Sequence, residues 1–117
     1  MTLEFSERPV APDIVVFELK GRMHSGNRLS DAEYAARKVI SDGNRKLVLD
    51  ISGVGYMDSA ALGMLVLVTS EISRQGGKAY VAGANPRVSE IFKICQAQVV
   101  LNLQDNLDSA LKAFAAA

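Results

Sequence analysis

The sequence predicts a single α/β domain in which a mixed five-stranded sheet carries about four helices. Five short segments are apolar in a manner typical of strands, and four longer segments repeat their apolar residues at helical spacing. After the first two strands, the two kinds of segment alternate, and right-handed crossovers then make most of the sheet parallel. The whole chain, residues 1–117, is expected to form one domain, because a chain of this length buries roughly two-thirds of its unfolded surface.

The first two strands are predicted to lie next to each other at the edge of the sheet. Residues 2–8 alternate between apolar and polar side chains, which is typical of an edge strand. Residues 8–13 (RPVAPD) are expected to turn the chain, since prolines cannot donate to a sheet ladder. Residues 14–21 form the returning strand. Its apolar residues on one face are Val15, Phe17 and Leu19.

A loop, a helix and a central strand follow. Residues 21–27 (GRMHSGN) are predicted to form the loop. The candidate N-caps of the first helix are Asn27, Ser30 and Asp31. The helix carries Leu29, Ala32, Ala36 and Val39 at helical spacing, and Gly43 is expected to end it. Residues 46–51 (KLVLDI) are almost continuously apolar, the pattern of a central strand buried on both faces.

The second half of the chain continues the alternation. A second helix is predicted from Ser59 to Gln75, ended by Gly76 and Gly77, and residues 78–83 form the fourth strand. Asn85 and Pro86 open a third helix. Its apolar residues are Val88, Ile91, Phe92 and Cys95. Residues 99–103 are predicted to be the fifth strand, and Asp105 is the expected cap of a last helix. The residues of that helix that face inward are Leu107, Leu111 and Phe114.

The composition excludes several classes of protein. Thirteen basic and thirteen acidic residues cancel, without a block of like charge, which argues against a nucleic-acid binder. The single Cys95 cannot form an internal disulfide and suits a reducing compartment. No signal-peptide pattern begins the chain, and the longest apolar run, residues 60–68, is far below the ~20 residues that cross a bilayer. We therefore expect a cytoplasmic domain without membrane insertion.

The pair Asp58–Ser59 lies between a predicted strand and a predicted helix, where a functional site is expected. In open α/β sheets, sites gather at the carboxyl ends of the strands, which here include the loops 21–27 and 52–59. Either residue of the pair could cap the second helix, which is worth about 1 kcal/mol. Capping does not account for Gly63, which costs the helix about 1 kcal/mol relative to alanine. This glycine leaves the Ser59 hydroxyl approachable or, alternatively, permits close packing of helix and sheet.

A catalytic role for Ser59 is less well supported than a role as a helix cap. A triad of Ser59, His24 and either Asp50 or Asp58 could assemble in space, but the G-x-S-x-G elbow is absent. A lone histidine in a polar loop is usually solvated. No catalytic residue is therefore expected.

Nucleotide and metal sites also lack their motifs. The segment GVGYMD places Asp58 where the third glycine of a dinucleotide motif belongs, and ISRQGGKA lacks the first glycine and the Ser/Thr of a P-loop. A phospho-aspartate receiver centred on Asp50 would need an acidic pair and a lysine that the other strand ends do not supply. No Cys/His cluster has metal-ligand spacing. No metal or cofactor is expected.

The segment KLVLDISGVGYMDSAALGMLV resembles the signature of the STAS domain family, the bacterial anti-sigma-factor antagonists. The similarity extends to VFELKGRM, GGKAYVAGANPRVSEIFKI and LDSALKAF, and so covers nearly the whole chain. The resemblance implies that Ser59 is the phosphoacceptor of a serine kinase that is also the anti-sigma factor. The unphosphorylated antagonist would bind this kinase and release the sigma factor, and a phosphatase would reset the switch. Asp58 and Gly63 would support the phosphosite, and the antagonist itself would not be an enzyme.

The resemblance also implies a partner-binding surface. The residues expected there are Arg22, Met23, His24, Ser25, Tyr56, Met57, Ala60, Met64 and Leu67. Met64 and Leu67 belong to a second apolar stripe of the helix, which either packs in the core or forms a docking patch. The chain departs from the family at Ala61, commonly glycine, and near Met23 and His24, where an acidic residue is common. The alternative function is a STAS subunit of a lipid-transport complex or signalling scaffold. We expect a monomer or weak dimer.

Overall fold

The computed structural model describes residues 2–116 and confirms the predicted order of strands and helices. The elements are β1 (Glu4–Ala11), β2 (Ile14–Met23), α1 (Leu29–Ser41), β3 (Lys46–Met57), α2 (Ser59–Arg74), β4 (Lys78–Ala82), α3 (Pro86–Ile94), the 3₁₀ helix η1 (Ala97–Val99), β5 (Leu103–Gln104) and α4 (Leu107–Ala116). Within residues 2–116, no helix is both long enough and apolar enough to cross a membrane.

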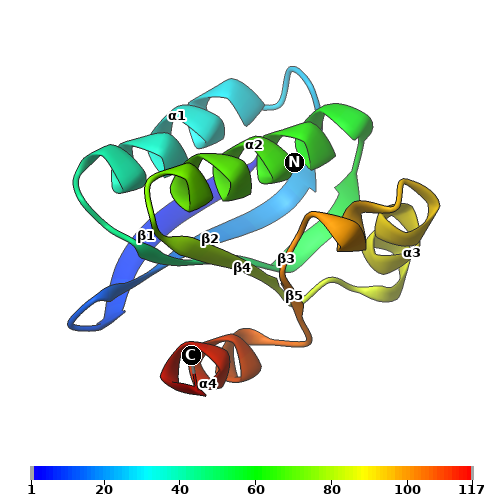
Figure 1. Cartoon of the computed structure of the whole chain (residues 1–117). Helices are drawn as coiled ribbons and strands as arrows, with labels where there is room; N and C mark the ends of the chain where they lie inside the picture. The colour runs from blue at the N-terminus through cyan, green and yellow to red at the C-terminus, as the bar shows by residue number, and fades with distance from the viewer. Residues whose placement is uncertain (1, 117) are drawn as a thin grey trace.

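The five strands form one mixed sheet in the order β1-β2-β3-β4-β5. β1 runs antiparallel to β2, and the remaining neighbours are parallel. Helices α1 and α2 lie side by side over one face, and α4 covers the other (Figure 1). The carboxyl ends of β2 and β3, the start of α2 and helix α3 therefore gather at one edge of the sheet, on the right of that view.

The sheet separates two apolar cores. The larger lies beneath α1, α2 and α3, and the smaller lies beneath α4. In the smaller core the rings of Tyr80 and Phe114 meet edge to face, with centroids 4.7 Å apart. β3 contributes Leu47 and Leu49 to the first core and Val48 to the second, so the prediction of a strand buried on both faces is confirmed.

Three strand boundaries differ from the prediction by three residues or more, and β2 continues to Met23, into the predicted loop 21–27. β1 continues through Pro9 to Ala11, because an edge strand can tolerate a residue without an N–H donor. β3 does not end at Ile51 but stays paired with β2 as far as Met57, so the predicted loop 52–59 is mostly strand. The fifth strand comprises only Leu103–Gln104, and the predicted start at 99–100 is instead exposed chain at and after η1.

The helix caps were predicted with mixed success. Asn85 caps α3, accepting a bond from the Val88 N–H at 2.8 Å, as expected. α4 is capped by Asn106 and not by Asp105, since Asn106 Oδ1 accepts from the Ser109 N–H at 2.8 Å. None of the three residues proposed for α1 is its N-cap. That position is Arg28, in a left-handed conformation with φ 64° and no side-chain cap.

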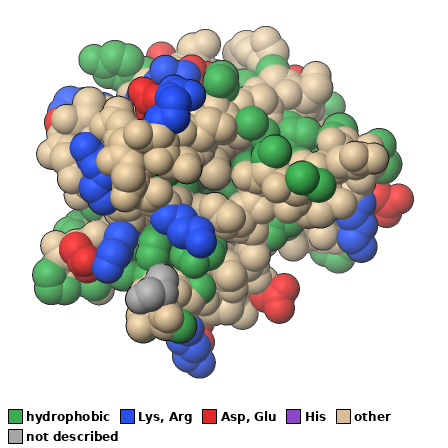
Figure 2. Space-filling view, viewed as in Figure 1, with side chains coloured by type: hydrophobic (Ala, Val, Ile, Leu, Met, Phe, Trp, Pro, Cys, Tyr) green, Lys and Arg blue, Asp and Glu red, His purple; other side chains and the backbone are tan. Residues whose placement is uncertain are grey.

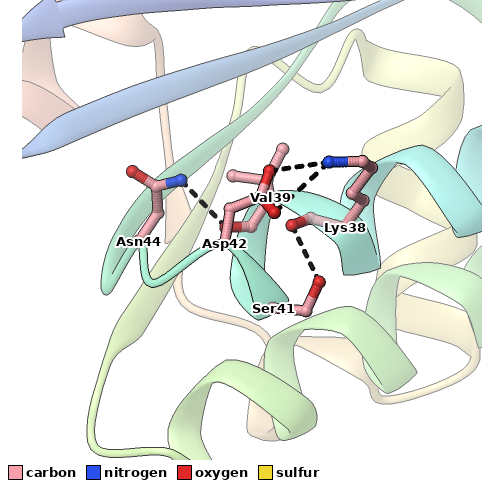
Figure 3. A network of polar contacts seen from close by, with 5 residues as sticks. All are labelled: Lys38, Val39, Ser41, Asp42 and Asn44. Carbon is pink, nitrogen blue, oxygen red and sulfur yellow. Dashed lines mark hydrogen bonds and ion pairs between the residues drawn. The ribbon is translucent and has the colours of Figure 1, made fainter.

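The end of α1 shows how its free carbonyl groups are satisfied (Figure 3). The Ser41 hydroxyl donates to the Lys38 carbonyl at 3.1 Å, and the Asn44 amide donates to the Val39 carbonyl at 2.9 Å. Lys38 Nζ pairs with the Asp42 carboxylate at 3.0 Å. Gly43 follows with φ 104°, so it ends the helix as predicted and allows the chain to turn toward β3.

Met64 belongs to the core, which corrects its assignment to a docking patch. Its side chain is 1% exposed, whereas Leu67, in the same predicted stripe, is 48% exposed. The face of α2 that packs on the sheet is wide enough to include Met64 beside Ala61, Leu65 and Val68. The second stripe is thus divided between core and surface.

Replacing Met64 by Asp is expected to lower the free energy of unfolding by about 3–4 kcal/mol, because a carboxylate would be buried without a partner. Thermal unfolding followed by circular dichroism measures the effect, and the melting temperature should fall by more than about 10 °C. Leu67→Asp is the matched control and should change it little. Equal, small shifts in the two variants would contradict the placement of Met64 in the core.

Candidate functional site

The candidate site lies where β3 passes into α2. β3 ends at Met57, Asp58 is the N-cap with extended backbone (φ −104°, ψ −177°), and Ser59 is the first residue of the helix. The predicted start of the second helix is confirmed. The junction lies at the carboxyl edge of the sheet, between the 24–27 loop and α3 (Figure 1).

Asp58 joins this helix to the loop after β2. Its Oδ1 accepts a hydrogen bond from the Ala61 N–H at 2.9 Å, which caps α2. Its Oδ2 accepts from the Ser25 N–H at 3.0 Å. The Asp58 N–H in turn donates to the Met23 carbonyl at 3.1 Å. One residue therefore starts the helix and also holds the 24–27 loop against it.

These contacts favour the charged carboxylate. Partial burial acts to raise the pKa of Asp58, but the N–H groups of Ala61 and Ser25, together with nearby His24, outweigh it and hold the pKa below its ordinary value. Because the pKa is lower in the folded than in the unfolded protein, Asp58 stabilises the fold at neutral pH. That contribution is lost as the pH falls through the lowered pKa.

Ser59 is not needed as a cap, since Asp58 fills that role. Its side chain is exposed, and among residues 2–116 its hydroxyl has no hydrogen-bond partner. A Cβ added at Gly63, one turn further along, would meet nothing within 4 Å. Close packing therefore does not explain this glycine, and the face beside Ser59 is open.

A small cationic and aromatic cluster lies where β2 and β3 end and the 24–27 loop begins. The Arg22 guanidinium lies 4.5 Å from the centre of the Tyr56 ring, and the His24 ring meets the same tyrosine edge to face at 6.2 Å. The loop closes on itself through the Asn27 amide, which donates to the Arg22 carbonyl at 2.8 Å. His24 Nδ1 lies 3.0 Å from the Ser25 carbonyl oxygen.

The geometry does not assemble the serine triad considered above. Within residues 2–116, no hydrogen bond joins Ser59 to His24, and the His24 ring contacts Ser25 and Tyr56 instead. Asp50 is buried and accepts from the Ser52 N–H at 3.0 Å. The described residues also contain no group of three or more His, Cys, Asp or Glu placed to hold a metal ion.

The predicted partner-binding residues divide by exposure. Arg22, Ser25, Ala60 and Leu67 are exposed, and His24 and Tyr56 are half-buried. Met23, Met57 and Met64 are buried, at 0%, 2% and 1%, so their assignment to the binding surface is wrong. All three side chains point into the larger core, where they support the site from beneath.

Sequence analysis missed the contact between Asp58 and Ser25. These residues are 33 positions apart, and no local pattern signals that they meet. The only available signal was that two strand ends fall at the same edge of a parallel sheet, which brings their loops together.

Surface character does not single out the site by itself. Lys/Arg and Asp/Glu side chains are scattered over the face seen in Figure 2, and hydrophobic side chains reach the surface at several places, on the left as well as on the right of the view. Among residues 2–116, the exposed large apolar side chains are those of Tyr34, Leu67, Ile94, Val99 and Val100.

A family model and several curated proteins match this chain, and they point to the same family. A family model described as the STAS domain matches residues 6–110. BtrV of Bordetella bronchiseptica, named an anti-sigma factor antagonist, is 29% identical over 97 residues, which are 82% of each chain. The anti-sigma-B factor antagonist of Staphylococcus aureus is 24% identical over 67 residues, 57% of this chain and 62% of that protein.

Solved structures share the fold at low sequence identity. An anti-sigma factor antagonist from Mycobacterium paratuberculosis superposes with a TM-score of 0.86 at 20% identity, covering 96% of this chain and 93% of that one. The unphosphorylated form of SpoIIAA gives a TM-score of 0.80 at 16% identity, with 97% and 98% covered. The STAS domain of a SulP transporter from Vibrio cholerae gives 0.72 at 22% identity, with 92% and 85% covered.

Replacing Asp58 by Asn is expected to free the 24–27 loop while α2 still begins at residue 59. Asparagine caps helices as well as aspartate does, but it has one acceptor oxygen and cannot serve both Ala61 and Ser25. Amide hydrogen exchange at Ser25 should become about tenfold faster, the equivalent of one lost hydrogen bond. Asp105→Asn, at an exposed position after β5, is the control. Unchanged protection of Ser25 in Asp58→Asn would contradict the tether.

Proposed function

This chain belongs to the STAS domain family, and from that membership we propose that it is an anti-sigma-factor antagonist controlled by phosphorylation of Ser59. Unphosphorylated, it binds a serine kinase that is also the anti-sigma factor, and the sigma factor is released. Phosphorylated, it leaves the kinase, and a phosphoserine phosphatase restores it. The observation that carries the proposal is an exposed Ser59 hydroxyl at a helix start that Asp58 already caps.

The position of Ser59 suits a phosphate. The first turn of a helix presents N–H groups and the positive end of the macrodipole, both of which favour an anion. Asp58 next to it acts in the opposite direction, and it already accepts from Ala61. These two effects offset each other within the domain, so the added charge acts mainly on the partner.

The surface that the kinase would contact surrounds this hydroxyl. Its exposed or half-buried members are Arg22, His24, Ser25, Tyr56, Ala60 and Leu67. The open face at Gly63 would let a kinase active site approach Ser59 from the side of α2 away from the sheet. The chain itself would perform no catalysis and would act in the cytoplasm, as a monomer or weak dimer.

The alternative is a subunit of a larger assembly, such as a lipid-transport complex or a scaffold. The fold similarity to a transporter STAS domain favours it. A structural subunit, however, needs no free hydroxyl beside a capping aspartate. The retention of both Asp58 and Ser59 in their separate roles favours the switch.

Ser59 is expected to be the residue that the cognate kinase labels with phosphate. The experiment incubates the protein with the kinase and ATP and measures incorporation by mass spectrometry. Ser59→Ala should abolish labelling, and Ser25→Ala, which removes an exposed hydroxyl across the site, should leave it intact. Undiminished labelling of Ser59→Ala would refute the assignment.

Phosphorylation of Ser59 is expected to weaken kinase binding about a hundredfold, or ~3 kcal/mol, because a phosphate of about −2 charge would be desolvated at the interface. Calorimetry on the phosphorylated and unphosphorylated forms measures the change. Amide chemical shifts should move only near residues 22–27 and 55–64, since no refolding is needed. Shifts spread through α3 and α4, or an unchanged affinity, would defeat this mechanism.

A further inference from the structure

The elements around Ser59 carry several cationic side chains, although the whole chain has no net charge. Residues 20–30 contain Lys20, Arg22 and Arg28, with His24 between them, and no Asp or Glu. On the other flank of Ser59, Arg87 lies exposed in the first turn of α3. That turn is held to the same edge, because the Asn85 side-chain amide donates to the Val54 carbonyl at 3.1 Å.

Two of these cations have no acidic partner within the described residues 2–116. Lys20 pairs with Glu18 at 3.4 Å, and Arg28 pairs with Asp31 at 3.6 Å, but Arg22 and Arg87 make no ion pair. Arg22 is held instead by the face of Tyr56, at 4.5 Å. A cation over an aromatic ring is positioned without being neutralised, so its charge remains available to a binding partner.

Among the described residues, the acidic side chains nearby do not pair with these two arginines. Both carboxylate oxygens of Asp58 accept backbone N–H groups, from Ala61 and Ser25. Glu90, one turn beyond Arg87 on α3, forms no ion pair with it. The elements on either side of Ser59 therefore carry two exposed guanidinium groups that form no ion pair within residues 2–116.

We propose that the docking face of the kinase partner is acidic and sets carboxylates against Arg22 and Arg87, an inference that rests on the function proposed above. Complementary charge raises association rates and selects partners. The same arrangement accounts for the direction of the switch. A phosphate on Ser59 would add negative charge at the same edge of the sheet, would thereby reduce the attraction that the two arginines exert, and would face the carboxylates of the partner.

The test measures the affinity of the kinase that labels Ser59 for four charge variants. Arg22→Glu and Arg87→Glu should each weaken binding about tenfold, mainly through slower association. Arg22→Lys should bind within about threefold of the unmodified protein, because it keeps the charge. Lys112→Glu is the matched control, since it makes the same change in net charge on α4, on the opposite face of the sheet, where Lys112 is 78% exposed. It should bind within about twofold of the unmodified protein.

Ionic strength supplies a second measurement. Added salt should weaken the unmodified complex more than the Arg22→Glu complex, because part of the screened attraction is already lost in the variant. Melting temperatures of all variants check that they are folded. If Ser59 is labelled but Arg22→Glu and Arg87→Glu bind as tightly as Lys112→Glu, the acidic partner face is refuted and the phosphorylation switch stands. If no kinase labels Ser59, the proposed function itself fails.

Discussion

The contact on which the site depends is the carboxylate of Asp58, whose two oxygens serve two different segments. One caps α2 through Ala61, and the other holds the 24–27 loop through Ser25. Without the first, a backbone N–H group in the first turn of α2 would lack an acceptor, and the Ser59 hydroxyl would be the nearest side chain able to accept from it. Without the second, the loop would lose its direct tie to the start of α2 and would be held near Ser59 by contacts such as the strand pairing before it and the packing of His24 on Tyr56. Asp58 thus leaves Ser59 exposed and also orders the surface around it.

Beneath this contact, apolar burial keeps the junction rigid. β2 and β3 remain paired up to Met23 and Met57, so the helix starts directly at the end of a supported strand. Both side chains are buried, as is Met64 one turn into α2, and burying each contributes about 1.5–3 kcal/mol. Methionines thus fill the space below the site. Its surface includes exposed polar and charged side chains such as those of Arg22 and Ser25.

The order of the strands and helices could be predicted because it depends on periodicity, which is local. The boundaries that failed depend on pairing: β3 continues to Met57 because β2 continues beside it, and Pro9 stays in β1 because no strand lies outside it. Met64 could not be assigned from the pattern alone, since α2 is apolar on two stripes and only packing decides which is covered. Asp58 and Ser59 were located as a pair, but the pattern allowed either of them to cap α2, and the tie from Asp58 to the loop is a hydrogen bond to a residue 33 positions away.

A rigid site has a consequence for how phosphorylation could act. The macrodipole of α2 would favour a phosphate on Ser59 by about 0.3–1 kcal/mol, and repulsion from the adjacent Asp58 carboxylate would be of similar size and opposite sign. Little free energy would then remain to move the domain, and any large movement would have to expose or repack the buried apolar side chains below the site. The proposed change of about a hundredfold in affinity would therefore arise where the phosphate meets another protein, because desolvation there strengthens each charge contact. Phosphorylation would then act by changing the surface charge around Ser59, and the fold would keep the residues of that surface in place.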